Sequence, residues 1–169
     1  TIKVNYPFFA RLNYKSEDAA GATDYFGLNY YSHIHIKFRF NPVEFFENKY
    51  LETDIMTDMP YAMYPEGIYR AIQSIQFLDK PIYITENGIA DETDDRRGTF
   101  IDQYLYAVYK AMEHGADIRG YFYWSLMDNF EWAEGYDMKF GLYEVDFNTQ
   151  KRTLRTGSKE FVKIVNESN

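Results

Sequence analysis

Three short apolar runs along the chain have the pattern of buried strands. They cover residues 24–30, 82–85 and 120–126, and turn-forming or polar residues bound them. Helical patterns separate the runs, which is the order of parallel α/β units. An open parallel sheet of only three strands would leave both outer strands unpaired, and strands of the buried type make poor exposed edges. On this pattern alone, we expect an α/β fold that is incomplete.

Three segments carry apolar residues at helical spacing. The first begins at Pro65, which suits the first turn of a helix. The second begins at Thr99 and ends just before Gly115, and the third covers about residues 158–165. Thr99 and Asp102 fit a capping box, and Gly115 fits a C-terminal cap.

The segment from residue 37 to residue 59 has mixed charges and Pro42, and it predicts a loop. Just before it, His33 and His35 lie on one face of an extended stretch. Metal ligation by this pair would need a third ligand, and none is evident in the sequence. We therefore favour a plain loop or strand face, and expect no metal site.

The second apolar run ends abruptly in a carboxylate, an amide and a glycine, at Glu86, Asn87 and Gly88. In parallel α/β folds, ligands and catalytic groups collect at the carboxyl ends of the strands. Glu86 is therefore a candidate for a carboxylate that points into a site. The structural alternative is that a Glu at a strand end caps the following loop.

Aromatic residues make up 20% of the chain, with 17 Tyr, 14 Phe and 2 Trp. Most of them must belong to the core, but Trp and Tyr also suit a pocket for sugars, which have apolar faces and hydroxyls. The net charge of −8 argues against nucleic acid as a partner, because phosphate binding needs clustered cations. The acidic run at residues 91–95 is interpreted as a solvated loop in preference to a cation site.

The absence of cysteine excludes disulfides, thiolate metal sites and cysteine nucleophiles. No apolar run is long enough to cross a membrane, so we expect no membrane partner. Residues 1–20 lack the charged and then apolar pattern of a signal peptide. A cytoplasmic location is favoured on these grounds, although the compartment itself stays open.

Four local motifs carry the chemistry of the chain, and together they resemble a known family. In this order they look like the carboxyl-terminal part of a glycoside hydrolase family 1 enzyme of the β-glucosidase type. The resemblance covers about residues 24–169, whereas residues 1–23 match only loosely. The motifs are DYFGLNYY at 24–31, YPEG at 64–67, ITENG at 84–88 and YWSLMDNFEW at 123–132, the last followed by FGL at 140–142.

The resemblance implies an α/β fold of the (β/α)8 TIM barrel type that hydrolyses β-glycosides with retention and needs no cofactor. Residues 1–169 would form the carboxyl-terminal part of one catalytic domain, with strands six, seven and eight of the barrel. Glu86 would be the nucleophile, and Tyr31 would hydrogen-bond to it. Sheet packing is the alternative for Tyr30 and Tyr31, and alternation along a strand lets only one of them face the site.

The resemblance also implies a sugar-binding set. Trp124 would stack under the sugar, Glu131 would accept hydrogen bonds from two hydroxyls, and Trp132 would donate its indole N–H. Asn29 and Phe140 would lie near the same site. The alternative for both tryptophans is a place in the core.

The chain departs from the family pattern in two respects. Tyr61 stands where many members carry a Trp that lines the leaving-group subsite, so the aglycone preference stays open. The Asn-Glu-Pro motif that carries the acid/base carboxyl in this family is absent. Because retaining hydrolysis needs two carboxyls about 5–5.5 Å apart, we expect the isolated chain to be inactive.

Two functional hypotheses follow. In the first, the chain is part of a retaining hydrolase of β-glycosides, and a complementary chain or self-association supplies the remaining barrel strands. In the second, it is a non-catalytic partial barrel or pseudoenzyme fragment with at most weak glycan binding. A scaffolding protein is a weaker third hypothesis, because the intact Glu86 speaks against it.

Overall fold

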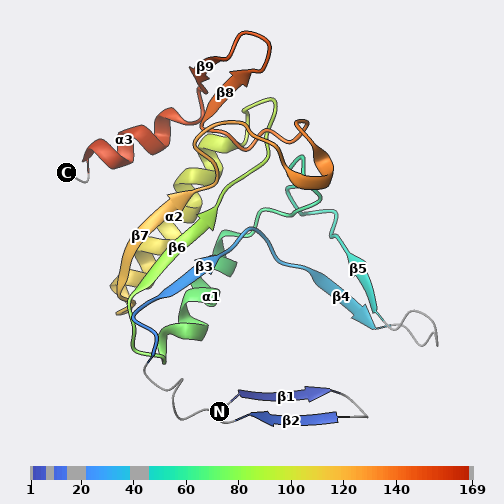
Figure 1. Ribbon diagram of the computed structural model, residues 1–169, viewed down its shortest axis with the longest axis vertical. Coiled ribbons are helices and arrows are strands. Elements are labelled where there is room, and N and C mark those ends of the chain that lie inside the picture. Colours follow the sequence, from blue (N-terminus) through green and yellow to red (C-terminus); the bar gives the residue numbers. More distant parts are fainter. Residues whose placement is uncertain (1, 7–9, 15–21, 39–45, 168–169) are drawn as a thin grey trace.

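A three-stranded parallel sheet lies at the centre of the computed structural model, which describes residues 2–6, 10–14, 22–38 and 46–167 (Figure 1). The central strand pairs with the other two in parallel register. The three strands predicted from the sequence are therefore confirmed, with ends shifted by at most three residues. In spatial order they are β3 (Phe26–Asn29), β6 (Ile82–Asn87) and β7 (Ile118–Tyr123).

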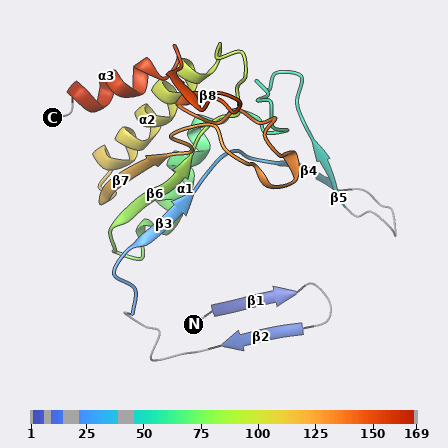
Figure 2. The same ribbon diagram turned by 45° about the horizontal axis from the view of Figure 1, so that its top comes forward.

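Three helices accompany the sheet, close to the predicted positions. Helix α1 (Pro65–Gln76) lies between β3 and β6 in the chain, and α2 (Arg97–Glu113) lies between β6 and β7. Both cover the same face of the sheet, and α3 (Lys159–Glu167) packs beside α2 (Figure 2). Pro65 is the first residue of α1, as its sequence position predicts.

The hydrophobic core lies between the sheet and these helices. Alternate residues of β6 face the helices, so that Ile82 and Ile84 are buried there. Burying one such side chain contributes about 1.5–3 kcal/mol. The helical residues that pack against the strand are Ile68 and Ile72 of α1 and Phe100, Ile101, Tyr104 and Ala111 of α2.

The other face of the sheet is largely open, which differs from the fully buried strands predicted. Thr85 is exposed, and Phe122 and Leu126 are 58% and 59% exposed. In the described part of the chain, β3 and β7 pair with no strand besides β6. Both outer edges therefore remain unpaired there, as expected for three units of a larger α/β sheet.

The amino end of α2 forms differently from the prediction. The helix begins at Arg97 and has no side-chain cap of its own, so the expected capping box of Thr99 and Asp102 is wrong. Instead, the carboxylate of Asp91 accepts hydrogen bonds from the N–H groups of Arg96 and Arg97, each at 2.9 Å. At the other end Gly115 has φ of +88°, which confirms it as the glycine that ends the helix.

Three antiparallel hairpins complete the described strands. Strands β4 (His35–Phe38) and β5 (Phe46–Lys49) form one of them, so the predicted loop over 37–59 is wrong at these positions. Pro42 lies outside the described residues. The other hairpins are β1 (Ile2–Tyr6) with β2 (Ala10–Tyr14) and β8 (Tyr143–Asp146) with β9 (Lys151–Leu154).

No helix in the described ranges is long and apolar enough to span a membrane.

Candidate active site

The carboxyl ends of β3 and β6 bring Tyr31 and Glu86 together. The Tyr31 hydroxyl donates a hydrogen bond of 2.8 Å to Oε2 of Glu86. The half-buried Glu86 lies opposite Asn29 in the register, where a bulge shifts the pairing of the two strands. The Asn29 side chain is exposed and accepts a hydrogen bond of 2.6 Å from the Thr85 hydroxyl. The two adjacent strand ends thus place a carboxylate, a phenol and an amide at one edge of the sheet.

The environment keeps Tyr31 protonated. Burial raises the pKa of its hydroxyl, and the hydrogen bond to Glu86 together with the negative charges of Glu86 and Glu131 raises it further. The phenol therefore remains a hydrogen-bond donor at neutral pH.

Asn87, the last residue of β6, and Gly88 after it pack closely against neighbouring segments. Asn87 is buried; its amide donates to the Tyr30 carbonyl oxygen and accepts from the Tyr121 hydroxyl, both at 2.6 Å. A Cβ atom at Gly88 would overlap the carbonyl oxygen of Trp124, so only glycine fits this close approach. This local packing holds the end of β6 against the end of β7.

Two aromatic side chains lie beside Tyr31. The ring centroids of Tyr61 and Phe140 each lie 6.2 Å from that of Tyr31, tilted and edge-on respectively. Phe140 is buried, and its carbonyl oxygen accepts a hydrogen bond from Ser125 N–H. The structure therefore gathers Tyr61 and Phe140 beside Tyr31, which in turn hydrogen-bonds to Glu86.

The two tryptophans occupy different environments. Trp124 follows β7, is partly buried, and donates its backbone N–H to the Asn87 carbonyl oxygen at 2.9 Å. Trp132 begins the short helix η1 (Trp132–Glu134) and is 82% exposed, so the core alternative is wrong for this residue. Glu131 precedes it and is tied to Gly135 through its backbone N–H. Among the described residues, the side chain of Glu86 hydrogen-bonds to Tyr31 alone.

Comparison with known proteins assigns the family. The model of glycosyl hydrolase family 1 matches residues 7–169. The chain belongs to glycosyl hydrolase family 1. It is 35% identical over 167 residues to beta-glucosidase A of Thermotoga maritima, and 45% identical over 103 residues to a beta-galactosidase of Pyrococcus woesei. A solved structure of a beta-glycosidase from Pyrococcus horikoshii superposes with a TM-score of 0.80 at 41% identity.

These alignments cover most of this chain but little of the family 1 relatives. The match to the Thermotoga protein covers 90% of this chain and 37% of that protein, and the match to the P. woesei protein covers 61% and 20%. The P. horikoshii superposition covers 96% of this chain and 38% of the neighbour. The structural neighbours are (β/α)8 barrels, and this chain matches part of such a barrel.

A buried cluster of charged side chains connects the family 1 motifs, and the sequence pattern did not predict it. Asp91 was expected in a solvated loop, but its side chain is fully buried and pairs with Arg96 at 2.8 Å. Burial opposes ionisation of Asp91, but the N–H groups of Arg96 and Arg97 and the Arg96 guanidinium outweigh it and lower the pKa. The signal was available as two arginines directly after the acidic run.

Arg97 links the loop after β6 to the loop that leads to Phe140. Its guanidinium is fully buried and forms an ion pair of 2.9 Å with Asp94. It donates to five further acceptors at 2.7–3.2 Å. These are the carbonyl oxygens of Ile89, Asp91, Lys139 and Phe140 and the hydroxyl of Tyr123.

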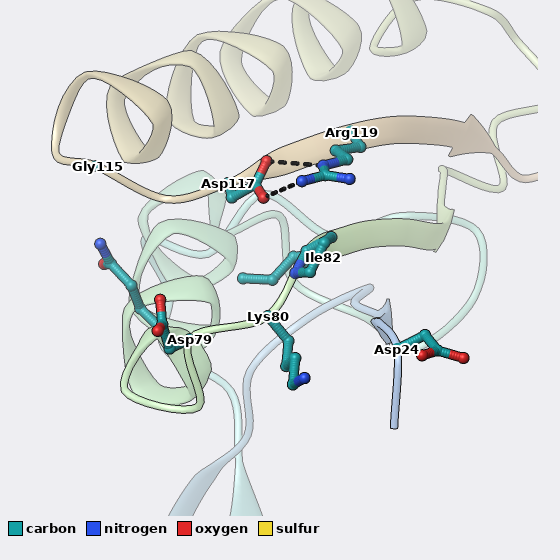
Figure 3. A pocket seen from close by; sticks show the side chains of 9 residues that line it. Asp24, Asp79, Lys80, Ile82, Gly115, Asp117 and Arg119 are labelled. Atoms are coloured by element: carbon teal, nitrogen blue, oxygen red, sulfur yellow. Dashed lines mark hydrogen bonds and ion pairs between the residues drawn. The ribbon is translucent and has the colours of Figure 1, made fainter. Parts of the chain in front are cut away.

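A cavity of about 420 Å³ lies at the opposite end of the sheet, and it is distinct from this site (Figure 3). Ile82, which begins β6, lines it, whereas Glu86 lies near the other end of the same strand. Its wall carries an exposed ion pair of 2.8 Å between Asp117 and Arg119. The cavity brings together none of the predicted site residues.

Proposed function

We propose that this chain supplies the nucleophile-bearing part of a retaining β-glycosidase, with Glu86 as the nucleophile. The hydrogen bond of 2.8 Å from Tyr31 to Glu86 carries the proposal. It orients the carboxylate, and retaining hydrolysis needs a well-positioned carboxylate to attack an oxocarbenium-like centre. Membership in glycosyl hydrolase family 1 supports the same chemistry.

The remaining site residues would hold the sugar. The exposed indole of Trp132 and the half-buried Trp124 offer an N–H donor and an apolar platform, and Glu131 offers a charged acceptor for two hydroxyls. Phe140 and Tyr61 would line the same pocket through their packing on Tyr31. A carboxylate at Glu131 disfavours phosphorylated sugars by charge repulsion, so the proposed substrate is an unmodified β-glucoside or β-galactoside.

The second carboxyl of the mechanism would come from outside this chain. Residues 1–169 would form the carboxyl-terminal part of one catalytic domain and supply strands six to eight of its barrel. The unpaired edges of β3 and β7 are where the remaining barrel strands would attach, and the open face around Phe122 would then face them. We therefore expect no turnover by the isolated chain.

A mechanism-based label tests the nucleophile. A 2-deoxy-2-fluoro-β-glucoside with an activated leaving group needs little acid assistance, and it traps the covalent intermediate on the attacking carboxylate. The reagent is applied to the native preparation that contains this chain, and the labelled peptide is mapped by mass spectrometry. Labelling at Glu86 that disappears in Glu86→Gln is expected. Labelling of a different carboxylate would refute the assignment.

A non-catalytic glycan-binding fragment is the second candidate, and the 82% exposure of Trp132 favours it for the isolated chain. Titration of the chain with cellobiose, followed by tryptophan fluorescence, distinguishes the two. Binding that Trp132→Ala abolishes, in a preparation without label or turnover, supports this candidate. Labelling of Glu86 supports the hydrolase.

A further inference from the structure

Three side chains that can bind a metal ion meet at the base of the β4–β5 hairpin. His33 follows β3, His35 begins β4, and Asp54 lies in the loop after β5. One ligand atom from each residue lies within 4.8 Å of the other two. The sequence suggested the histidine pair but showed no third ligand, because Asp54 is distant in the chain and only the hairpin brings it back.

Two of the distances between these ligand atoms lie on either side of the value that one Zn²⁺ ion requires. The Nε2 atoms of His33 and His35 share a hydrogen bond of 2.7 Å, which a bound ion would replace, and Nε2 of His35 is 3.9 Å from Oδ2 of Asp54. Zn²⁺ binds nitrogen and carboxylate oxygen at about 2.0–2.2 Å, which places two ligands of a tetrahedral ion about 3.3 Å apart. Ring and carboxylate rotations that move these atoms by less than about 1 Å would bring both of these distances to that value.

Two groups of this cluster, the Asp54 carboxylate and Nδ1 of His33, have few partners among the described residues. The Asp54 side chain is only 11% exposed, and its one hydrogen bond from a described residue is the Leu51 N–H at 2.7 Å. Within the described ranges, the basic side chain that lies near Asp54 is the His35 imidazole, at 3.9 Å. The Nδ1 atom of His33 is buried and has no hydrogen-bond partner among the described residues. A bound dication would compensate the charge of the largely buried Asp54 carboxylate.

The surroundings leave room on one side and support the rings on the other. The Tyr64 ring lies 4.2 Å from that of His33, centroid to centroid. A cavity of about 350 Å³ opens beside the cluster, and Thr53 and Gln103 also line it. That space accommodates the water molecule that would complete four-coordination around the ion.

We propose that His33, His35 and Asp54 bind one Zn²⁺ ion, with water as the fourth ligand. Two imidazoles and a carboxylate suit Zn²⁺, whereas a site for Mg²⁺ or Ca²⁺ would be built from oxygen ligands alone. The ion would tie the start of β4 to the loop at residues 51–54, just before the segment that carries Tyr61. The proposal is independent of the assignment of Glu86.

Metal binding by the full 169-residue chain tests the site. The chain, freed of metal by a chelator, is titrated with ZnCl₂ in a calorimeter and, separately, with CoCl₂ while the visible absorption is recorded. We expect one Zn²⁺ per chain and the intense absorption bands of four-coordinate Co²⁺. Each of His35→Ala and Asp54→Asn should weaken binding by about tenfold or more and remove the Co²⁺ bands, because each deletes a ligand.

Two matched variants control for folding and for non-specific binding. His114→Ala removes the one histidine outside the cluster, and Glu52→Gln removes an exposed carboxylate near Asp54. Both should bind Zn²⁺ as the unaltered chain does. Zinc should also raise the melting temperature of the unaltered chain but not that of Asp54→Asn, whose metal-free circular dichroism should stay unchanged. Absence of saturable binding, or equal affinity in His35→Ala and His114→Ala, would overturn the site.

Discussion

Arg97 offers the sharpest test of how this structure is held together. Arg97→Met keeps the length of the side chain but removes its charge and all its hydrogen-bond donors. Four carbonyl oxygens, the Tyr123 hydroxyl and the Asp94 carboxylate would then lose a partner. The loops after β6 and before Gly141 would lose the group that joins them.

The expected cost follows from burial. The Arg97 side chain is fully buried and that of Asp94 is 13% exposed, so water cannot readily replace the lost donors. Removing one partner of a buried ion pair costs about 3–5 kcal/mol, and each buried acceptor left unpaired costs about 1–3 kcal/mol where it cannot relax. Because some carbonyls will relax toward water, we expect the free energy of unfolding to fall by about 3–5 kcal/mol.

Urea denaturation followed by circular dichroism measures this change, with thermal melting as a second probe. Arg119→Met is the matched control, because Arg119 pairs with Asp117 at 2.8 Å but both side chains are more than half exposed. Exposed pairs contribute little, so the control should melt as the unaltered chain does. A loss below about 1 kcal/mol in Arg97→Met, or equal losses in the two variants, would refute the reasoning from burial.

Three further predictions concern the site and its supports. Tyr31→Phe removes a hydrogen bond to a carboxylate worth about 1.5–3 kcal/mol, so labelling of Glu86 in the completed enzyme should slow about tenfold to a hundredfold; an unchanged rate would show that Tyr31 does not act on Glu86. Gly88→Ala forces a Cβ into the Trp124 carbonyl oxygen and should lower the free energy of unfolding, measured by urea denaturation, by about 1–3 kcal/mol. Gly135→Ala is the control, because an added Cβ there meets no atom within 4 Å and only the positive φ opposes alanine. Equal losses in the two variants would contradict this. The pKa of Asp91 is lowered in the folded chain, so its contribution to stability is present above the unfolded value of about 3.9 and is lost as the pH falls through the lower folded value. Asp91→Asn should therefore flatten the fall in the urea midpoint below about pH 4, and an unchanged slope would count against the buried pair.

The site residues could be predicted from the sequence because they lie in contiguous motifs. One apolar run is followed directly by Glu86, Asn87 and Gly88. The run before it contains Asn29 near its end and is followed by Tyr31. In a parallel sheet such strand ends must share one edge, so neighbouring motifs predict neighbouring side chains. The 2.8 Å contact between Tyr31 and Glu86 agrees with that inference.

The sequence by itself determined the parallel strands, the three helices and the family, because apolar periodicity and local motifs act over a few residues. Only the tertiary structure decided which charges are buried. It buried the side chains of Asp91 and Arg97, and it brought Asp54 close to the histidine pair. It also made the Asp91 carboxylate, and not Thr99, the group that caps the start of α2. The partners in these contacts come from segments whose approach depends on packing and chain reversal, and desolvation then decides which pairs persist. Composition and periodicity therefore do not predict these contacts.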